Sequence, residues 1–112
     1  MGAAGSSGAR LTFEQIAQLV QEDKYHYSSH AEERTAERGI TDAQVKETIL
    51  KGEVLETYTE DVRGWSYLVL GFPKGQPLHV HVGYNRYRGL AIVITVYIPE
   101  PPAWAAPRQR GA

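Results

Sequence analysis

Apolar residues recur at helical spacing in the first half of the chain and at alternating positions in the second half. In the first half this pattern predicts helices over residues 12–22, 30–38 and 42–50. Each predicted helix begins at a residue suited to capping free backbone amides, namely Thr12, Ser29 and Thr41, and Gly39 and Gly52 mark two of the ends. The first half is therefore expected to fold as two to three short helices.

After Gly52 the period of the pattern changes to two, as in strands that bury one face. The predicted strands are Glu53–Glu60, Trp65–Phe72, Leu78–Tyr84 and Leu90–Ile98. Short turns connect them, and short turns join antiparallel neighbours, because a parallel pair needs a crossover of about a dozen residues or more. The predicted fold class is α+β, with the helices packed on one face of a four-stranded antiparallel meander sheet.

The alternation also assigns side chains to the two faces of the predicted sheet. The face that the helices would cover is aliphatic, with Leu78, Val80 and Val82 on the third strand and Leu90, Ile92, Ile94, Val96 and Ile98 on the last. The opposite face gathers His79, His81, Thr95 and Tyr97. Because these polar groups can donate, accept or transfer protons, the second face is the one expected to hold chemistry.

Both ends of the chain have compositions that do not favour a packed core. Residues 1–10 are mostly Gly, Ala and Ser, so a disordered leader is expected there. The Pro-rich stretch from Pro99 onward is expected to be extended, with Trp104 as its large apolar anchor. The sequence thus predicts a single domain over residues 11–104 and a disordered tail over residues 105–112.

The 112 residues carry a formal net charge of −1 and contain no cysteine. This charge argues against a protein that coats nucleic acid non-specifically, but it leaves room for a local basic cleft. The lack of cysteine excludes disulfides and thiolate metal sites. No apolar run is long enough to span a membrane and no signal-peptide pattern opens the chain, so a cytoplasmic protein without membrane contact is expected.

Three basic residues, His30, Arg34 and Arg38, follow each other at four-residue intervals along the second predicted helix. Residues at this spacing share one helix face, where two arginines would bind phosphate oxygens well. The alternative is a solvated face on which nearby glutamates such as Glu37 pair with the arginines. Composition alone favours the solvated face, whereas the histidine at the head of the run makes the two interpretations about equal.

On the predicted third strand, His79 and His81 would project side by side, as an acid–base pair or a two-ligand metal site requires. No cysteine or characteristically spaced carboxylate supports the metal interpretation. Histidines on a partly exposed strand without a special role are the commoner case. Thr95 and Tyr97 would complete a polar cluster on the same face, although tyrosine is also an ordinary strand residue.

The predicted turn before the last strand contains Arg86, Tyr87 and Arg88. Aromatic rings stack on unpaired bases while guanidinium groups hold phosphates, so this loop is a candidate RNA-binding element. A polar hairpin loop with two solubilising arginines is the alternative, and the loop alone favours it.

Several motifs occur in an order that resembles a known family. They are Ser-His-Ala-x-x-Arg-x-x-x-Arg-Gly-Ile, Gly-Glu-Val-Leu-Glu-x-Tyr, Leu-x-Leu-Gly, Pro-Leu-His-Val, Ile-Thr-Val-Tyr-x-Pro and a trailing Trp, between Ser29 and Trp104. The ordered set resembles the bacterial domain-of-unknown-function family 4258. The matched positions that bear candidate chemistry are His30, Arg34, Arg38, His79, Thr95, Tyr97 and Trp104, whereas His81 stands where an apolar residue is expected.

That family is similar in layout to the RelE-like (BECR-type) toxins, in which helices precede an antiparallel sheet. The resemblance implies a toxin–antitoxin-type, metal-independent ribonuclease without a cofactor, neutralised by a protein antitoxin that is often a small zinc-finger protein. The expected roles are acid or base for His30 and His79, a second acid or a positioning group for Tyr97, and phosphate or RNA binding for Arg34, Arg38 and Thr95.

Two other functions are kept open by the sequence. One is a non-catalytic module with the same fold that binds protein or RNA, which the near-neutral charge favours. The other is a metal-dependent hydrolase that uses His79, His81 and His30. An exposed sheet edge is further expected to recruit either an antitoxin strand or a second copy of the chain.

Overall fold

Three helices form where the periodic pattern places them. In the computed structural model, which describes residues 10–60 and 64–111, they are α1 (Phe13–Gln21), α2 (Ser29–Arg38) and α3 (Asp42–Lys51). Thr12 and Thr41 each form the predicted capping box with a glutamine three residues later. The N-cap of α2 is Ser28 rather than Ser29, and Gly39 ends this helix in the left-handed conformation, with φ 66°.

The second half of the chain forms the sheet. Successive strands β2 (Glu53–Tyr58), β3 (Ser66–Gly71), β4 (Leu78–Asn85) and β5 (Leu90–Tyr97) pair antiparallel. A fifth strand, β1 (Tyr25–Tyr27), pairs parallel to β5, so the sheet is mixed and has the order β1-β5-β4-β3-β2. The prediction of a four-stranded, wholly antiparallel sheet is therefore wrong. The sequence does not reveal β1, because three residues are too few to show a period of two.

A shared carboxylate holds β1 against the rest of the domain. The hydroxyls of Tyr25 and Tyr27 both donate to the side chain of Asp42 at the start of α3, over 2.7 to 2.9 Å. Burial, followed by these bonds to a carboxylate, raises the pKa of both tyrosines. The short strand is thus fixed by its side chains on α3 as well as by the backbone pairing with β5.

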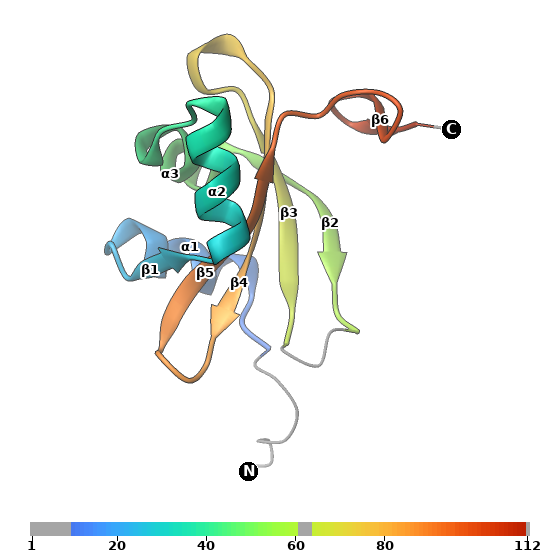
Figure 1. Cartoon of the computed structure of the whole chain (residues 1–112). Coiled ribbons are helices and arrows are strands. Elements are labelled where there is room, and N and C mark those ends of the chain that lie inside the picture. Colours follow the sequence, from blue (N-terminus) through green and yellow to red (C-terminus); the bar gives the residue numbers. More distant parts are fainter. Residues whose placement is uncertain (1–9, 61–63, 112) are drawn as a thin grey trace.

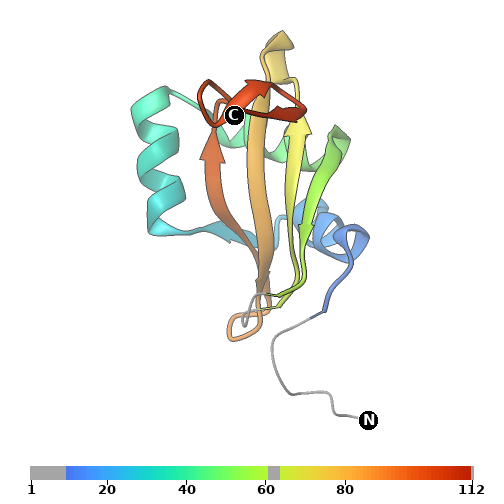
Figure 2. The ribbon, with the colours of Figure 1, turned by 90° about the vertical axis from the view of Figure 1, so that its right-hand side faces the viewer.

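The helices and the C-terminal segment lie on different sides of the sheet (Figure 1). α1 and α3 cover one face, and α2 lies along the edge of the sheet beside β5 (Figure 2). The core between the helices and the sheet consists of Ile16, Val20, Ala31, Val45, Ile49, Tyr67, Val69, Leu78, Val80, Val82, Ala91, Val93 and Val96. We call the face of the sheet turned away from α1 and α3 the open face.

One extra residue in β5 changes which side chains reach the core. Val82 is paired with Val93 and His81 with Thr95, so Ile94 is inserted as a β-bulge. Before the bulge Ala91 and Val93 are buried in the core, which corrects the prediction that Ile92 and Ile94 face the helices. After the bulge the predicted alternation holds, because Val96 is in the core.

A small hairpin of β6 (Trp104–Ala106) and β7 (Gln109–Arg110) crosses the open face near one end of the sheet (Figure 2). The structure thus differs from the predicted disordered tail over residues 105–112, because residues up to 111 are folded onto the sheet. A single 3₁₀ turn, η2 (Pro73–Gly75), connects β3 to β4. The predicted leader lies outside the described residues except for Arg10. Among the helices of the described chain, none is long and apolar enough to cross a membrane.

Candidate functional site

The first turn of α2 is tied directly to β5. The Ser28 hydroxyl accepts from the backbone amide of Ala31 at 3.0 Å and donates to the carbonyl oxygen of Ile94 at 2.7 Å. The backbone amide of Ser28 also donates to the carbonyl oxygen of Val93 at 2.9 Å, and Ala31 is fully buried. These contacts use the carbonyls at the bulge and fix the orientation of α2 along the sheet edge.

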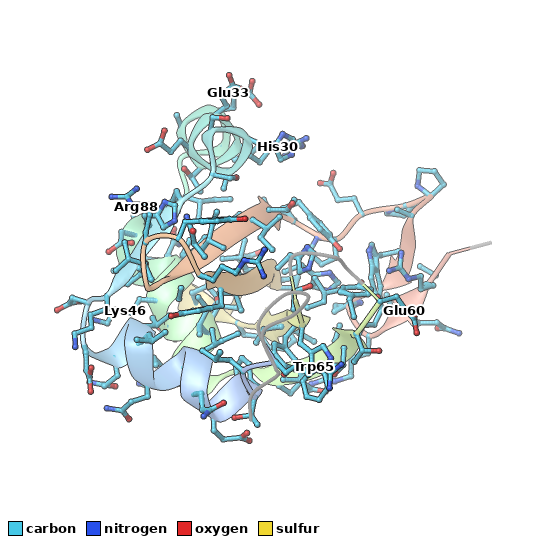
Figure 3. The ribbon with its side chains drawn as sticks, turned by 90° about the horizontal axis from the view of Figure 1, so that it is seen from below. His30, Glu33, Lys46, Glu60, Trp65 and Arg88 are labelled. Carbon is cyan, nitrogen blue, oxygen red and sulfur yellow. The ribbon has the colours of Figure 1, made fainter. Side chains whose placement is uncertain are left out.

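The basic residues of α2 differ in their surroundings. The His30 side chain is exposed and points from the helix toward the side of the open face, whereas Glu33 points away from the sheet (Figure 3). Arg34, one turn further along, is partly buried. Neither His30 nor Arg34 makes a side-chain hydrogen bond or ion pair with residues 10–60 or 64–111, so the glutamates of α2 do not neutralise them. The pairing of Arg34 with Glu37, the alternative interpretation of this helix face, is absent from that part of the chain.

Arg38 lies two turns beyond His30, at the end of α2. Its guanidinium is 3.9 Å from the carboxylate of Glu100, and both side chains are largely exposed, so this ion pair is weak. Arg38 also lines a shallow groove with Ile40 and Ile98. The structure thus places His30 and Arg34 together and Arg38 at the far end of the same helix.

His79 is buried beneath the C-terminal hairpin. None of its surface is exposed, its Nε2 lies 2.8 Å from the carbonyl oxygen of Pro107, and its Nδ1 lies 3.1 Å from the Tyr97 hydroxyl. The indole N–H of Trp104 donates to the same hydroxyl at 3.1 Å, and the Trp104 ring packs edge-on against the imidazole.

The partners of His79 determine which of its ring nitrogens carries the proton. The Pro107 carbonyl can only accept, so His79 Nε2 carries the proton and Nδ1 accepts from the Tyr97 hydroxyl. Burial is the main cause that lowers the pKa of His79 and raises that of Tyr97. A neutral, enclosed imidazole of this kind supports the fold, and no substrate reaches it while the hairpin is in place.

Two ion pairs hold this hairpin on β2. Arg110 forms a two-pronged pair with Glu56 at 2.6 and 2.9 Å, and Arg108 binds Glu53 at 2.8 Å. Hydrogen bonding to these arginines is the main cause that lowers the pKa of both carboxyls. The Arg110 guanidinium also lies over the Trp104 ring, 4.5 Å from its centroid.

His81, unlike His79, is only partly buried. Its Nε2 lies 2.8 Å from the Ser66 hydroxyl, and its ring packs edge-on against Tyr58 at 5.0 Å between centroids. Burial and a hydrogen bond to Glu56 raise the pKa of Tyr58 to about 12. On the neighbouring strand His81 is paired with Thr95, which is itself next to the bulge that anchors α2. Of the two histidines on β4, the more accessible one is therefore the one that the family pattern does not predict.

The turn between β4 and β5 forms a third polar group. Tyr87 is 85% exposed, and the Arg86 guanidinium lies 5.1 Å from the centroid of its ring. Arg88 approaches His26 of β1, which in turn contacts Asn85. Sequence reasoning missed His26, because strand β1 was not recognised, and it missed Ser66, because nothing in the sequence shows which residue faces His81.

The candidate residues therefore fall into three separate groups. His30 and Arg34 lie on α2, His79 is enclosed under the hairpin with the partly buried Tyr97 bonded to it, and Arg86, Tyr87 and Arg88 lie on the β4–β5 turn. No group of three or more His, Cys, Asp or Glu residues within 10–60 and 64–111 is arranged to hold a metal ion. Both ring nitrogens of His79 are already hydrogen bonded, so in this conformation His79 has no nitrogen available to bind a metal ion together with His81.

Comparison with known proteins identifies the family of this chain. A family model described as "Domain of unknown function (DUF4258)" matches residues 27–98, from the end of β1 to the residue after β5. No curated protein and no solved structure matches the chain at a significant level. The match covers α2, α3 and strands β2 to β5, and it leaves out α1 and the C-terminal hairpin. Because it spans well over half of the chain, this protein belongs to the DUF4258 family of domains of unknown function.

Proposed function

We propose that this domain cleaves RNA without a metal ion, at the junction between α2 and the open face of the sheet. The observation that carries the proposal is the unneutralised basic face of α2. His30 and Arg34 lie one turn apart beside β5, and neither is paired with a carboxylate in the described chain. A guanidinium and an imidazole in this setting suit a phosphodiester, because one binds the anion and the other transfers protons.

The reaction proposed is attack by the 2′-hydroxyl of the RNA. A base removes the hydroxyl proton, the oxygen forms a bond to the adjacent phosphorus, and the bond from phosphorus to the 5′-oxygen breaks. An acid protonates the leaving 5′-oxygen, and a 2′,3′-cyclic phosphate remains on the other fragment. Arg34 would stabilise the negative charge on the phosphorane-like transition state, and His30 would act as base or acid.

The second proton-transfer group in this proposal is His81. It is the partly exposed histidine of the open face, and only strand β5, with Thr95 opposite His81, separates it from α2. The His81 ring lies against Ser66 of β3 and Tyr58 of β2, so in this proposal it would turn from Ser66 toward Thr95 to reach a phosphate held by α2. His79 and Tyr97, expected from the sequence to be catalytic, take a supporting role, because both are tied to the hairpin.

Cleavage of a fluorescent RNA by the purified chain tests the proposal. His30→Ala and Arg34→Ala are each expected to lower the rate by about 10²-fold or more, since general acid–base catalysis and stabilisation of transition-state charge both contribute on that scale. Both residues make no side-chain bond in the described chain, so the variants should fold. Glu33→Ala is the matched control, because this side chain points away from the sheet (Figure 3). A chelator should leave the rate unchanged, and the product should end in a cyclic phosphate.

Absence of cleavage by the wild-type chain would contradict the proposed ribonuclease activity. Equal cleavage by all variants would contradict the proposed site. The burial of His79 favours one other function, a module of this fold that binds RNA without cutting it. That function predicts loss of binding to RNA in Arg34→Ala, without cleavage by any form. Expression of the same set in a bacterial host, with growth and total RNA followed, connects either result to toxicity.

We propose that a small protein antitoxin inhibits this domain. The resemblance to toxins implies that the antitoxin is of the zinc-finger type. Strand β2 forms one edge of the sheet, and Val54 on it is exposed, so a partner strand or a second copy of the chain would dock there. A bulge between Val54 and Glu56 interrupts this edge and limits the length over which pairing can occur. Light scattering of the purified chain would show whether it self-associates. If a second copy docks at β2, the wild type should be dimeric and Val54→Glu monomeric, whereas a free edge should give a monomer in both.

A further inference from the structure

A second polar site lies where the edge strand β1 meets the β4–β5 turn. His26 on β1 contacts Asn85 at the end of β4 and Arg88 in the turn. None of these contacts belongs to the α2 face, and Figure 3 shows Arg88 at the turn.

The orientation of the Asn85 amide is fixed by the turn itself. Its Oδ1 accepts from the backbone amides of Tyr87 and Arg88, at 3.0 and 3.3 Å. The Nδ2 group, which can only donate, then lies 3.1 Å from His26 Nε2. His26 Nε2 must therefore accept, and the proton of the neutral imidazole is on Nδ1.

This arrangement leaves two donors facing each other. His26 Nδ1 lies 3.5 Å from Nη1 of Arg88, and a guanidinium has no acceptor. Moving the imidazole proton to Nε2 would only transfer the conflict to Asn85. Burial first and Arg88 second lower the pKa of His26, while Glu32 on α2 acts in the opposite direction. Within the described chain no acceptor lies between the Nδ1–H and the guanidinium.

We infer that His26 and Arg88 together form a binding site for a phosphate group. One phosphate oxygen would accept from His26 Nδ1–H and another from the guanidinium, which resolves the conflict between the two donors. Tyr87, next in the chain, exposes 85% of its surface and offers a ring face for an unpaired base. A phosphate with a base beside it is the backbone of single-stranded RNA. Only this choice of RNA rests on the proposed function, whereas phosphate binding itself does not.

Two titrations followed by NMR of the histidine side chains test the site. Inorganic phosphate, added at constant ionic strength against chloride, should shift the His26 resonances saturably and raise the pKa of this imidazole. A short RNA with 2′-O-methyl groups, which cannot be cleaved, should cause the same shift at lower concentration. Arg88→Gln should weaken both responses by about tenfold, corresponding to about 1.4 kcal/mol. Lys24→Gln, which removes a neighbouring exposed charge, is the control and should change neither.

The outcomes separate this site from the cleavage reaction. If His26 does not respond to phosphate, or responds equally in Arg88→Gln, the site is overturned even when RNA is cleaved. If an acidic peptide shifts His26 and the methylated RNA does not, RNA is the wrong ligand. If the methylated RNA binds through Arg88 but natural RNA stays intact, the phosphate site stands and the cleavage proposal falls.

Discussion

The Nε2 atom of His79 lies 2.8 Å from the carbonyl oxygen of Pro107, which joins the middle of the sheet to a hairpin 28 residues further along the chain. On the other side of the ring, Tyr97 donates to Nδ1 and accepts from Trp104. The three residues thus form a chain of hydrogen bonds that runs from Trp104 through Tyr97 to His79 and ends at the Pro107 carbonyl. This chain of bonds explains why a residue expected to be catalytic is instead enclosed.

Replacing Tyr97 with phenylalanine should destabilise the domain. The change removes the partner of both His79 Nδ1 and the Trp104 indole N–H, and a buried polar group without a partner costs about 1–3 kcal/mol. Urea unfolding would measure the loss. Tyr84→Phe is the control, since the Tyr84 hydroxyl makes no hydrogen bond with the described residues. If Tyr97 were an acid of the reaction, Tyr97→Phe would lower cleavage while the free energy of unfolding stayed unchanged.

The same burial of His79 predicts how stability depends on pH. The folded state lowers the pKa of His79 below its ordinary value of 6.5, so the unfolded chain binds more protons over the range between the two pKa values. The contribution of His79 to the free energy of unfolding should therefore be complete above about pH 6.5. It should be lost as the pH falls from there through the lower pKa of the folded state. His26 contributes with the same sign, because its pKa is lowered as well.

Urea unfolding between pH 7.5 and 5.5 checks this dependence. His79→Gln removes the titrating group and should flatten the slope, whatever its effect on stability at neutral pH. Tyr84→Phe again serves as the control, because it leaves every histidine in place. A wild-type slope that persists in His79→Gln would mean that His79 does not carry the effect. Loss of the pairs at Glu53 and Glu56 also lowers stability, but only near and below their ordinary pKa of 4.5.

The sequence predicts the helices and strands β2 to β5 well, because each is long enough to show its period. It does not predict β1, whose three residues are fixed by Asp42 and by parallel pairing with a strand far along the chain. It also misassigns Ile92, since one inserted residue exchanges the faces of a strand.

For the candidate site, the sequence places His30 and Arg34 on one helix face, which follows from helical spacing alone. It does not reveal that His79 is enclosed, because the covering segment is Pro-rich and carries few apolar residues. What folds that segment onto the sheet is Trp104 together with the ion pairs of Arg108 and Arg110, and their partners Glu53 and Glu56 are over 50 positions away. Such long-range pairs have no local signal in a single sequence.

The ion pair of Glu56 with Arg110 should contribute only modestly to stability. Its geometry is two-pronged, but more than half of the Arg110 side chain is exposed, and solvent weakens such pairs. A double-mutant cycle with Glu56→Gln and Arg110→Gln should give a coupling energy of about 0.2–1 kcal/mol, smaller in high salt. A coupling well above this range would mean that Arg110 acts mainly by closing the hairpin over Trp104.

Ser28 offers the sharpest test of how α2 is positioned. Its hydroxyl both caps the helix and donates to the Ile94 carbonyl, so Ser28→Ala should cost about 1–2 kcal/mol. Ser29→Ala is a closely matched control, because Ser29 is exposed and its hydroxyl makes no hydrogen bond with the described chain. Hydrogen exchange at the amide of Ala31 should become faster only in Ser28→Ala. If α2 holds the reacting groups, RNA cleavage should fall in this variant at a pH and temperature where it remains folded. Unchanged cleavage with a loosened α2 would place the chemistry elsewhere, because this anchor holds the helix of His30 and Arg34 against β5.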